Sequence, residues 1–358
     1  MSDLGVTELM GSPKPIRRSG GRTTAVLVVL FAVIVGVGAV VLPSAWGKVF
    51  GSSNPDFSGA GSGQVIAHVV IGASAGDIGD ELRIKGVVKS AGAFRKAASK
   101  NPKSRTIQPG YYRMRLQMKA SLALDLMLNP ISRLRSRVTI PEGTSLARTL
   151  RLIAANTTGV PLADLETAAK NTAAIGLPDY AKGHVEGFLF PATYEIEPNT
   201  SAVEVLSMMT QRFGLSATTL GLVDGARANG LTPLQVVTLA SIIERESAGG
   251  DDRGKVAQVF INRFRRGMTF GSEATVRYAL GYPTRELTAT DLKVNSPYNT
   301  YRYAGFPPGP IGNPGDAALK AAINPTPGPW LYFFTRADRT TVFSTTAAQF
   351  EASQRGNT

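Results

Sequence analysis

The sequence predicts an α+β protein that is held in a membrane by one N-terminal transmembrane helix. Three features support this class. A long apolar run lies near the N-terminus, a short unit of strand-like and helix-like segments follows, and the remainder is rich in helical periodicity with a few short strands. The chain has 358 residues, of which 43% are hydrophobic and 18% charged, so most of it can bury a core.

The apolar run extends from Ala25 to Leu42 without a charged residue. At about 1.5 Å per residue, a helix of this length crosses a hydrocarbon core of roughly 30 Å. We therefore predict a transmembrane helix over residues 23–46. A cleaved signal peptide is the alternative, but residues 43–48 match a small-x-small cleavage site poorly.

Basic residues are distributed unequally around this helix. Four of them precede it, and only Lys48 follows it closely. The positive-inside rule therefore predicts that residues 1–22 form a cytoplasmic tail and that the bulk of the chain lies outside the cytoplasm. The expected location is the inner or plasma membrane, with a single span.

The formal net charge of the chain is +13 at pH 7. A surface of this sign either binds polyanions, such as lipid head groups or anionic wall polymers, or serves solubility alone. Nucleic acid is not expected as a partner outside the membrane.

A flexible tether and a compact unit are predicted after the membrane helix. Residues 47–64 are rich in glycine and serine, which is typical of a tether. Residues 65–134 then form a βααβ unit, which resembles a LysM domain, a small glycan-binding module. In its second strand, alternation predicts a buried face made by Tyr112, Met114, Leu116 and Met118. The expected strand, two helices and strand occupy residues 65–71, 77–84, 91–99 and 111–118.

A mixed α+β domain is predicted over residues 135–358. Residues 141–143 give a turn after a short strand, and Ser145 is a favourable N-cap for the helix that follows. Helical periodicity recurs at residues 161–170, 202–213, 233–247, 255–266, 273–280 and 316–323. Short strands are expected at residues 138–140, 192–196, 330–335 and 341–344.

Two classes of catalysis are disfavoured by the residues present. The chain has no cysteine and only two histidines, His68 and His184, so we expect neither a metal nor another cofactor. Residues 72–76 match the G-x-S-x-G pattern of a hydrolase nucleophile, but only one predicted strand precedes them. We interpret this pattern as the turn that begins the helix at Asp77.

The most informative segment is the helix predicted over residues 233–247. Thr232 is a favourable N-cap and Pro233 occupies the first helical position, so the start of this helix is well marked. Two glycines, Gly249 and Gly250, follow its last residues and are typical of a helix end.

A carboxylate extends the apolar face of this helix into its last turn. Spacings of three, four and seven residues align Leu239 and Ile243 with Glu246. Burial and the negative end of the helix dipole both raise the pKa of such a carboxyl, as a general acid at neutral pH requires. Glu244 is the rival on another face, and an ordinary ion pair between Glu246 and Arg253 is the structural alternative.

Sequence blocks around this helix closely resemble the membrane-bound endolytic murein transglycosylases, the MltG or YceG-like family. The helix carries L-A-S-I-I-E-R-E-S (239–247), and K-V-A-Q-V-F-I-N-R-F-R-R-G-M (255–268) follows it. The resemblance covers roughly residues 65–352. Further blocks in family order are E-G-F-L-F-P-A-T-Y (186–194), S-E-A-T-V-R-Y-A-L-G (272–281), S-P-Y-N-T-Y (296–301) and G-F-P-P-G-P-I-G-N-P-G (305–315).

The resemblance implies that Glu246 is catalytic, because the family's glutamate is the second one in its E-x-E-[TS] block. It also implies endolytic cleavage of MurNAc–GlcNAc β-1,4 bonds in nascent peptidoglycan, beside penicillin-binding synthases. One carboxyl protonates the leaving oxygen and then deprotonates the C6 hydroxyl of the muramic acid, which attacks C1. The product ends in 1,6-anhydroMurNAc, and the intramolecular hydroxyl has the advantage of proximity over water.

The remaining polar groups of these blocks are expected to bind and orient sugar. Gly271 departs from the family, which often has Gln there, so a substrate contact at this position is missing or replaced. For the two tyrosines among the candidates, core packing is the alternative to ring stacking. The candidates are the rings of Tyr298 and Tyr301, the amides of Asn262, Asn299 and Asn313, and the side chains of Ser272 and Glu273.

Two other functions remain open at this point. A muramidase-type hydrolase needs a second carboxylate near Glu246, for which Asp251, Asp252 and Glu273 are the candidates. A non-enzymatic glycan-binding scaffold needs only the LysM-like unit, although the complete E-R-E-S block argues against it.

Overall fold

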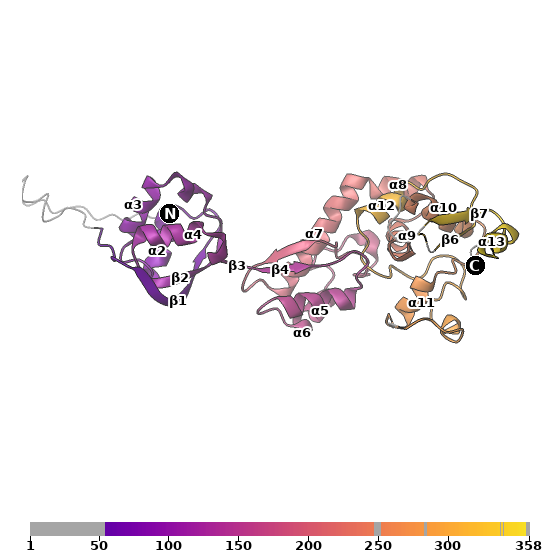
Figure 1. Cartoon of the computed structure of the whole chain (residues 1–358), viewed down its shortest axis with the longest axis horizontal. Coiled ribbons are helices and arrows are strands. Elements are labelled where there is room, and N and C mark those ends of the chain that lie inside the picture. Colours follow the sequence, from indigo (N-terminus) through magenta and orange to yellow (C-terminus); the bar gives the residue numbers. More distant parts are fainter. Residues whose placement is uncertain (1–53, 247–251, 283–284, 337, 339, 356–358) are drawn as a thin grey trace, which may run out of the picture.

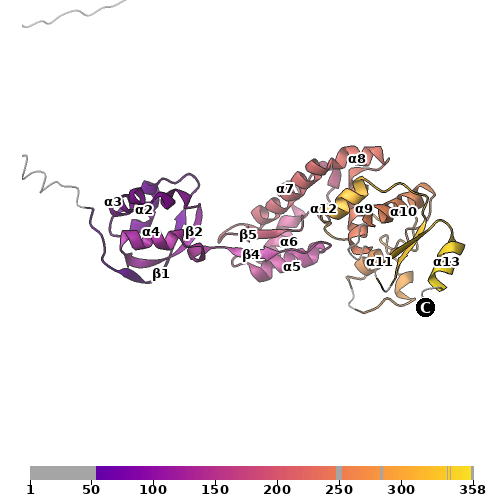
Figure 2. The ribbon, with the colours of Figure 1, turned by 45° about the horizontal axis from the view of Figure 1, so that its top comes forward.

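The structure is a computed structural model that describes residues 54–246, 252–282, 285–336, 338 and 340–355. The predicted cytoplasmic tail, the predicted membrane helix and the first part of the tether lie outside these residues. Within the described ranges, no helix is both long enough and apolar enough to cross a membrane. Figures 1 and 2 show an elongated arrangement, in which the N-terminal subdomain and the C-terminal helices lie at opposite ends.

The N-terminal subdomain contains the predicted strand, two helices and strand, but the first strand begins at Ala60, so residues 60–64 of the predicted tether belong to the sheet. The four elements are β1 (Ala60–Val69), α2 (Ala75–Ile84), α3 (Ala91–Lys100) and β2 (Gly110–Met118), and β1 pairs with β2 in antiparallel fashion. Helix α4 (Ala120–Leu128) and strand β3 (Arg133–Leu134), which joins the sheet beside β2, follow. The helices bury their apolar faces against the sheet, with Leu82, Phe94 and Met114 fully buried.

Local chemistry explains where these helices begin. Ser74 caps α2 in a capping box with Asp77, so the G-x-S-x-G pattern is a helix start, as interpreted. Ser121 is a residue type that favours the N-cap position, but it lies inside α4 and does not cap it. Helix α4 instead begins at Ala120, whose N–H donates to the Asp56 carboxylate at 2.9 Å.

The predicted alternation of β2 is interrupted near its end. Tyr112, Met114 and Met118 are buried as expected, but the side chain of Leu116 is 38% exposed. Gln117 has a φ of 57°, and the register with β1 shifts between Ser62 and Val65 on the opposite strand. This irregularity turns Leu116 out of the core.

A junction of two ion pairs connects the subdomain to the rest of the chain. Arg133 contacts the Glu197 carboxylate at 2.6 Å, and Arg135 pairs with Glu195. The pairs flank the point at which β3 ends and β4 (Ser136–Thr139) begins. The chain thus passes from one sheet to the next at residue 135.

The middle part contains a two-stranded sheet covered by helices. Strand β4 pairs with β5 (Thr193–Ile196), and Val138, Ile153 and Leu206 belong to its core. Its helices, together with the one that leads to the next part, are α5 (Leu146–Asn156), α6 (Leu162–Lys170), α7 (Ala202–Leu220) and α8 (Leu222–Ala228). Helix α7 extends beyond the predicted range, and α8 was not predicted.

The C-terminal part is built around one central helix, α9 (Pro233–Glu246). Every side chain from Val236 to Ile243 on it is buried, so the helix is enclosed on all sides. Helices α8, α10, α11 and α12 pack against it. The bounds of its other elements are α10 (Arg253–Arg265), α11 (Glu273–Ala279), α12 (Asp316–Ile323), β6 (Tyr332–Thr335), β7 (Thr341–Ser344) and α13 (Ala347–Arg355). Together the three parts confirm a mixed α+β fold.

Candidate active site

Glu246 ends α9 and lies against the start of α11. The Ser272 hydroxyl donates a hydrogen bond to Oε1 of Glu246, and the backbone N–H of Ala274 also donates to this carboxyl. Ser272 is the N-cap of α11 but makes no side-chain bond to its own helix, so its hydroxyl serves Glu246 instead. The carboxyl thus bridges the end of one helix and the beginning of another.

The protonation state of Glu246 is shifted by this environment. Burial raises the pKa of the carboxyl above its ordinary value, and the nearby charge of Glu273 adds to this effect. The bonds from Ser272 and Ala274 and the charge of Arg263 favour the anion and limit the rise in pKa. The carboxyl therefore holds a proton at higher pH than a free glutamate, as a general acid must.

A buried threonine fixes the segment that contacts Glu246. The Thr300 hydroxyl accepts from the Ser272 N–H at 3.1 Å, and the Thr300 carbonyl accepts from the Gly271 N–H at 2.9 Å. Thr300 and Thr275 also share a hydrogen bond of 2.8 Å between their hydroxyls. Residues 271–272 are therefore held in place from two sides.

Arg263 is a member of the site that the sequence reasoning missed. Its Nε donates to the Leu331 carbonyl at 2.6 Å, and its Nη1 donates to the Phe270 carbonyl. Its guanidinium carbon lies 5.3 Å from the centre of the Tyr332 ring. Burial lowers the pKa of Arg263. The signal that could have found it is an arginine two residues after the buried run of α10, which ends at Ile261.

Gly271 and Tyr301 form the open side of the site. Gly271 has a φ of +61°, and a Cβ added to it would lie 3.6 Å from Nη1 of Arg263 and 3.8 Å from Cε1 of Tyr301. A side chain at this position would therefore project between those two residues. The side chain of Tyr301 is 40% exposed, and its pKa is raised by burial and then by the charges of Glu273 and Glu246. Tyr301 is thus beside the carboxyls and accessible.

Two of the predicted sugar ligands, Asn262 and Asn299, have their amides engaged inside the protein. Asn262 donates to the carbonyls of Gly328 and Trp330 at 2.9 and 2.8 Å. Asn299 is fully buried and donates to two backbone carbonyls, while its oxygen accepts from Tyr301 N–H. Both N–H groups of each side-chain amide donate to backbone carbonyls, so neither amide has a donor left for a sugar. The two amides hold loops together instead.

Asn313 is fully buried and connects three distant segments. Its side-chain oxygen accepts from the N–H groups of Gly187 and Leu189, at 3.0 Å each. Its amide nitrogen donates to the Thr144 carbonyl at 2.9 Å. This arrangement gives Asn313 a structural role in place of the expected contact with substrate.

Tyr298 and Glu186 belong to a second polar cluster. Tyr298 packs against Tyr278, with their ring centres 4.7 Å apart, which matches core packing, the alternative left open for it. Glu186 is 8% exposed. Its carboxyl accepts from the Leu146 N–H at 2.8 Å and shares a side-chain hydrogen bond with Tyr278. Burial raises the pKa of Glu186 to about 7. Its block was recognised in the sequence, but this residue was not singled out.

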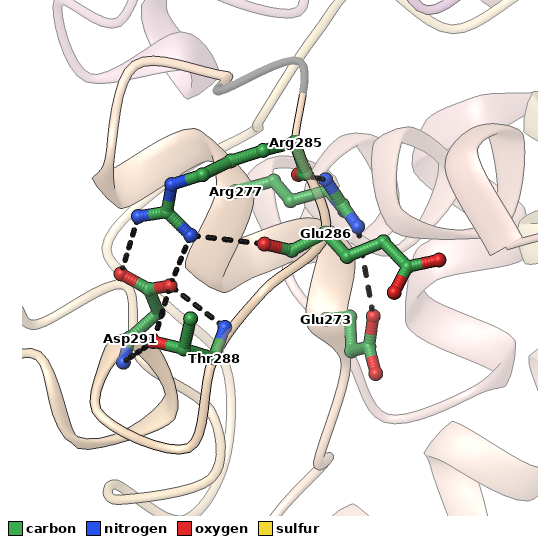
Figure 3. A network of polar contacts seen from close by, with 6 residues as sticks. All are labelled: Glu273, Arg277, Arg285, Glu286, Thr288 and Asp291. Carbon is green, nitrogen blue, oxygen red and sulfur yellow. Dashed lines mark hydrogen bonds and ion pairs between the residues drawn. The ribbon is translucent and has the colours of Figure 1, made fainter.

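Glu273 belongs to a network of polar contacts that begins at α11. Its carboxylate lies 4.0 Å from Arg277, and its side chain is 57% exposed. Figure 3 shows that Arg277 also donates to the Arg285 carbonyl, at 3.0 Å, and that Arg285 pairs with Asp291. Glu273 influences the pKa of Glu246 without sharing a hydrogen bond with it in the described residues. Of the other two candidates for a second carboxylate, Asp252 pairs with Lys255 at 3.0 Å, and Asp251 lies outside the described residues.

Glu244 faces a different part of the protein from Glu246. Its Oε2 accepts from the Gly315 N–H at 3.0 Å, and its Oε1 lies 4.0 Å from Arg253. Arg253 therefore pairs with Glu244, and the alternative of an ion pair between Arg253 and Glu246 is not what the structure contains. Burial raises the pKa of Glu244 as well, but the residue anchors the start of α12.

Comparison with known proteins identifies the family. The model of the YceG-like family matches residues 67–356, and the chain belongs to that family. An endolytic murein transglycosylase from Bacillus subtilis is 30% identical over 294 residues, which cover 78% of this chain and 81% of that protein. One from Streptococcus pneumoniae is 35% identical over 162 residues, which cover 43% of this chain and 28% of that protein.

A solved structure is also similar. The crystal structure of a putative YceG-like protein from Listeria monocytogenes aligns with a TM-score of 0.57 at 27% identity. The alignment covers 81% of this chain and 98% of the Listeria chain. The YceG-like fold therefore extends over most of the described residues.

Proposed function

We propose that this protein is an endolytic murein transglycosylase, which cuts MurNAc–GlcNAc β-1,4 bonds within peptidoglycan glycan strands. The observation that carries the proposal is the Glu246 carboxyl, which has a raised pKa and defined donors at the end of α9. The names of the relatives from B. subtilis and S. pneumoniae support the same reaction class.

In the proposed mechanism, Glu246 first gives its proton to the glycosidic oxygen that leaves. The C6 hydroxyl of the MurNAc then attacks C1, and the Glu246 carboxylate takes the proton of that hydroxyl. Ser272 and Ala274 stabilise the carboxylate between these two steps, since both donate to it. The product carries a 1,6-anhydro ring, and no water is consumed.

A mechanism with one carboxyl agrees with the engagement of the neighbouring acids. A hydrolase needs a second carboxyl that activates water or attacks the sugar. Glu273 is exposed and paired with Arg277, and Asp252 is paired with Lys255. Among the described residues of the site, Glu246 is therefore the proposed acid. Its carboxyl accepts from the Ser272 hydroxyl and the Ala274 N–H, and it lies near the exposed Tyr301.

We also propose the membrane topology that the sequence predicts. The apolar run from Ala25 to Leu42 anchors the chain, its N-terminus is cytoplasmic, and the active site acts on glycan outside. Penicillin-binding synthases are the expected neighbours. A reporter that is active only in the cytoplasm should be silent when it is fused after Thr358, and a strong signal would contradict this topology.

The reaction is tested by digesting purified glycan strands and weighing the fragments. The protein should release internal fragments that end in anhydroMurNAc, each lighter by one water than a hydrolytic product. Glu246→Gln should lower the rate by at least about a hundredfold, because general acid–base catalysis contributes this much or more. Its melting temperature should stay the same or rise slightly, since a partly buried carboxyl is removed.

Each alternative predicts a different result from the same digest. Reducing ends would keep Glu246 as the acid but make the protein a hydrolase. No fragments at all would favour a glycan-binding scaffold. A Glu246→Gln protein that cuts at nearly the parent rate would remove Glu246 from the mechanism.

A further inference from the structure

The positive charge of the chain is concentrated in the N-terminal subdomain. Between Glu81 and Asp125 there are eleven Lys and Arg residues and no acidic residue, whereas residues 135–358 hold 22 basic and 19 acidic residues. All eleven are exposed. They are Arg83, Lys85, Lys89, Arg95, Lys96, Lys100, Lys103, Arg105, Arg113, Arg115 and Lys119.

The subdomain also exposes an unusual share of large apolar side chains. Seven of the eleven such side chains among the described residues lie between residues 54 and 134. Two of them are Ile84, which is 68% exposed, and Leu116, which is 38% exposed. Single exposed apolar residues are normal, but these two lie together with lysines at one end of the subdomain.

Backbone hydrogen bonds bring this end together from separate segments. The Gln117 N–H donates to the Gly86 carbonyl at 2.9 Å, and the Lys119 N–H donates to the Gly59 carbonyl at 2.7 Å. A Cβ added to Gly86 would lie 3.4 Å from Cδ2 of Leu116. The end of α2, the loop before α3 and the end of β2 are therefore adjacent. We call the exposed residues Ile84, Lys85, Lys89, Leu116 and Lys119 the N-proximal surface.

The chain enters the subdomain at this same surface. The Ser90 hydroxyl donates to the Pro55 carbonyl at 2.9 Å, and Nζ of Lys89 lies 5.9 Å from the centre of the Phe57 ring. Eleven residues separate Asn54 from Leu42, where the apolar run ends. At no more than about 3.6 Å per residue, they span at most roughly 40 Å. If that run is in a membrane, this surface stays close to it.

We propose that the N-proximal surface docks on the anionic lipid head groups of the membrane in which the N-terminal helix is anchored. A soluble polyanion would need only the lysines, whereas the boundary between head groups and acyl chains also accommodates Ile84 and Leu116. Its acidic neighbours are already engaged. Asp56 accepts from the N–H groups of Phe57 and Ala120, and Glu81 accepts from the His68 N–H and lies 4.0 Å from Lys85.

This docking is independent of the reaction assigned to Glu246, but it rests on the proposed anchor. Its consequence is orientation, because the subdomain would be fixed at two points, the membrane helix and the N-proximal surface. The C-terminal helices, which lie at the opposite end of the molecule, would then point away from the bilayer (Figure 1).

The test uses the full chain in lipid nanodiscs and one polarity-sensitive fluorophore. The protein has no cysteine, so a single introduced cysteine is labelled without background. Ile84→Cys reports on the N-proximal surface, and Ile71→Cys is the matched control, because Ile71 is 91% exposed in the turn before α2, whereas Ile84 ends that helix. Discs contain brominated lipid as a quencher, with phosphatidylglycerol or with phosphatidylcholine alone. Co-elution with the discs reports the anchor separately.

The label at residue 84 should be quenched in phosphatidylglycerol discs at least about twofold more than the label at residue 71, and high salt should reverse the difference. Replacing Lys85, Lys89 and Lys119 together by Gln should lower the ratio of docked to undocked protein on the order of a hundredfold. Replacing Lys96, Lys100 and Lys103 by Gln removes the same charge elsewhere on the subdomain and should have little effect.

Three results would overturn the proposal. The first is equal quenching of both labels, and the second is equal quenching in both lipids. The third is a response of the label at residue 84 to soluble poly(glycerol phosphate) but not to discs, which would make the surface a site for wall polymers. Failure of the protein to elute with discs would refute the anchor and, with it, this docking, while leaving the reaction of Glu246 untouched.

Discussion

The hydroxyl of Ser272 donates to Oε1 of Glu246 and so joins the end of α9 to the start of α11. We expect Ser272→Ala to slow cleavage by about tenfold, since it removes one charge-assisted hydrogen bond from the carboxylate. The bond favours the anion, so its loss should raise the pKa of Glu246 further. A general acid works protonated, and the alkaline limb of the kcat/KM profile should therefore move to higher pH. Ser272→Thr keeps a hydroxyl and should restore the limb. If the alkaline limb of the kcat/KM profile is the same in Ser272→Ala as in the parent, Glu246 is not the group whose ionisation causes that limb.

Glu244 provides the control for Glu246, because both glutamates lie in the last turns of α9. Glu244→Gln removes a buried carboxyl with a raised pKa and keeps an oxygen that can accept from the Gly315 N–H, so the melting temperature should stay the same or rise slightly. Most of the cleavage rate should remain. Thermal melting and the strand digest, run side by side, check this. A large loss of rate with an unchanged melting temperature would transfer the catalytic role to Glu244.

Asn313 should matter for folding rather than for substrate affinity. Asn313→Ala leaves the N–H groups of Gly187 and Leu189 buried without a partner, which should cost about 3 kcal/mol or more. Asn295→Ala, at an exposed position, should cost much less. Denaturant unfolding measures both. A variant with normal stability and a raised KM would instead support the sugar contact expected from the sequence.

Tyr301 is the predicted aromatic ligand that remains accessible beside Glu246. Tyr301→Ala should raise KM by roughly tenfold through loss of a stacking surface, whereas Tyr301→Phe should change it little. Tyr303 is similarly exposed, at 44%, and Tyr303→Ala is the matched control. Equal effects at both positions would mean that the losses are not specific to the site.

Glu186 should make stability depend on pH. Its pKa is about 7 in the folded protein, above the ordinary value of 4.5, so folding favours the protonated form. Its carboxyl causes no penalty below about pH 4.5, and the penalty grows between about pH 4.5 and 7 and stays constant above that range. It reaches at most about 3 kcal/mol, given 1.36 kcal/mol per pKa unit. Glu186→Gln should therefore stabilise the protein at pH 8 relative to the parent and not at pH 4.5. Calorimetry at the two pH values tests this, and an equal shift at both would contradict it.

Local signals in the sequence predicted most elements and the position of Glu246. Thr232 and Pro233 marked the start of α9, and the apolar spacing up to Ile243 aligned Glu246 with the buried face. Helix α13 escaped prediction because it buries no residue fully and is held by ring contacts of Phe350 with β6. Periodicity is weak in such a helix.

The amide ligands could not be assigned from the sequence, because their partners lie far along the chain. Asn313 is hydrogen-bonded to Gly187, which is 126 residues away in the sequence, and Asn262 is hydrogen-bonded to Trp330, which is 68 residues away. A motif shows that an asparagine is present but not whether its amide is already used inside the fold. Leu116 shows the same limit for packing, since its exposure follows from the left-handed conformation of Gln117 and the register shift on the opposite strand.

The burial of α9 from Val236 to Ile243 limits how the proposed active site can evolve. The residues from Val236 to Ile243 fill the core of the C-terminal part, and the same helix fixes the backbone of Glu246. A substitution that moves this helix by a fraction of an ångström would change the core and the chemistry together. Adaptation to a different glycan should therefore accumulate at Tyr301, which is 40% exposed, and at Gly271, where a new side chain would project between Arg263 and Tyr301 and would have to adopt a φ of +61°.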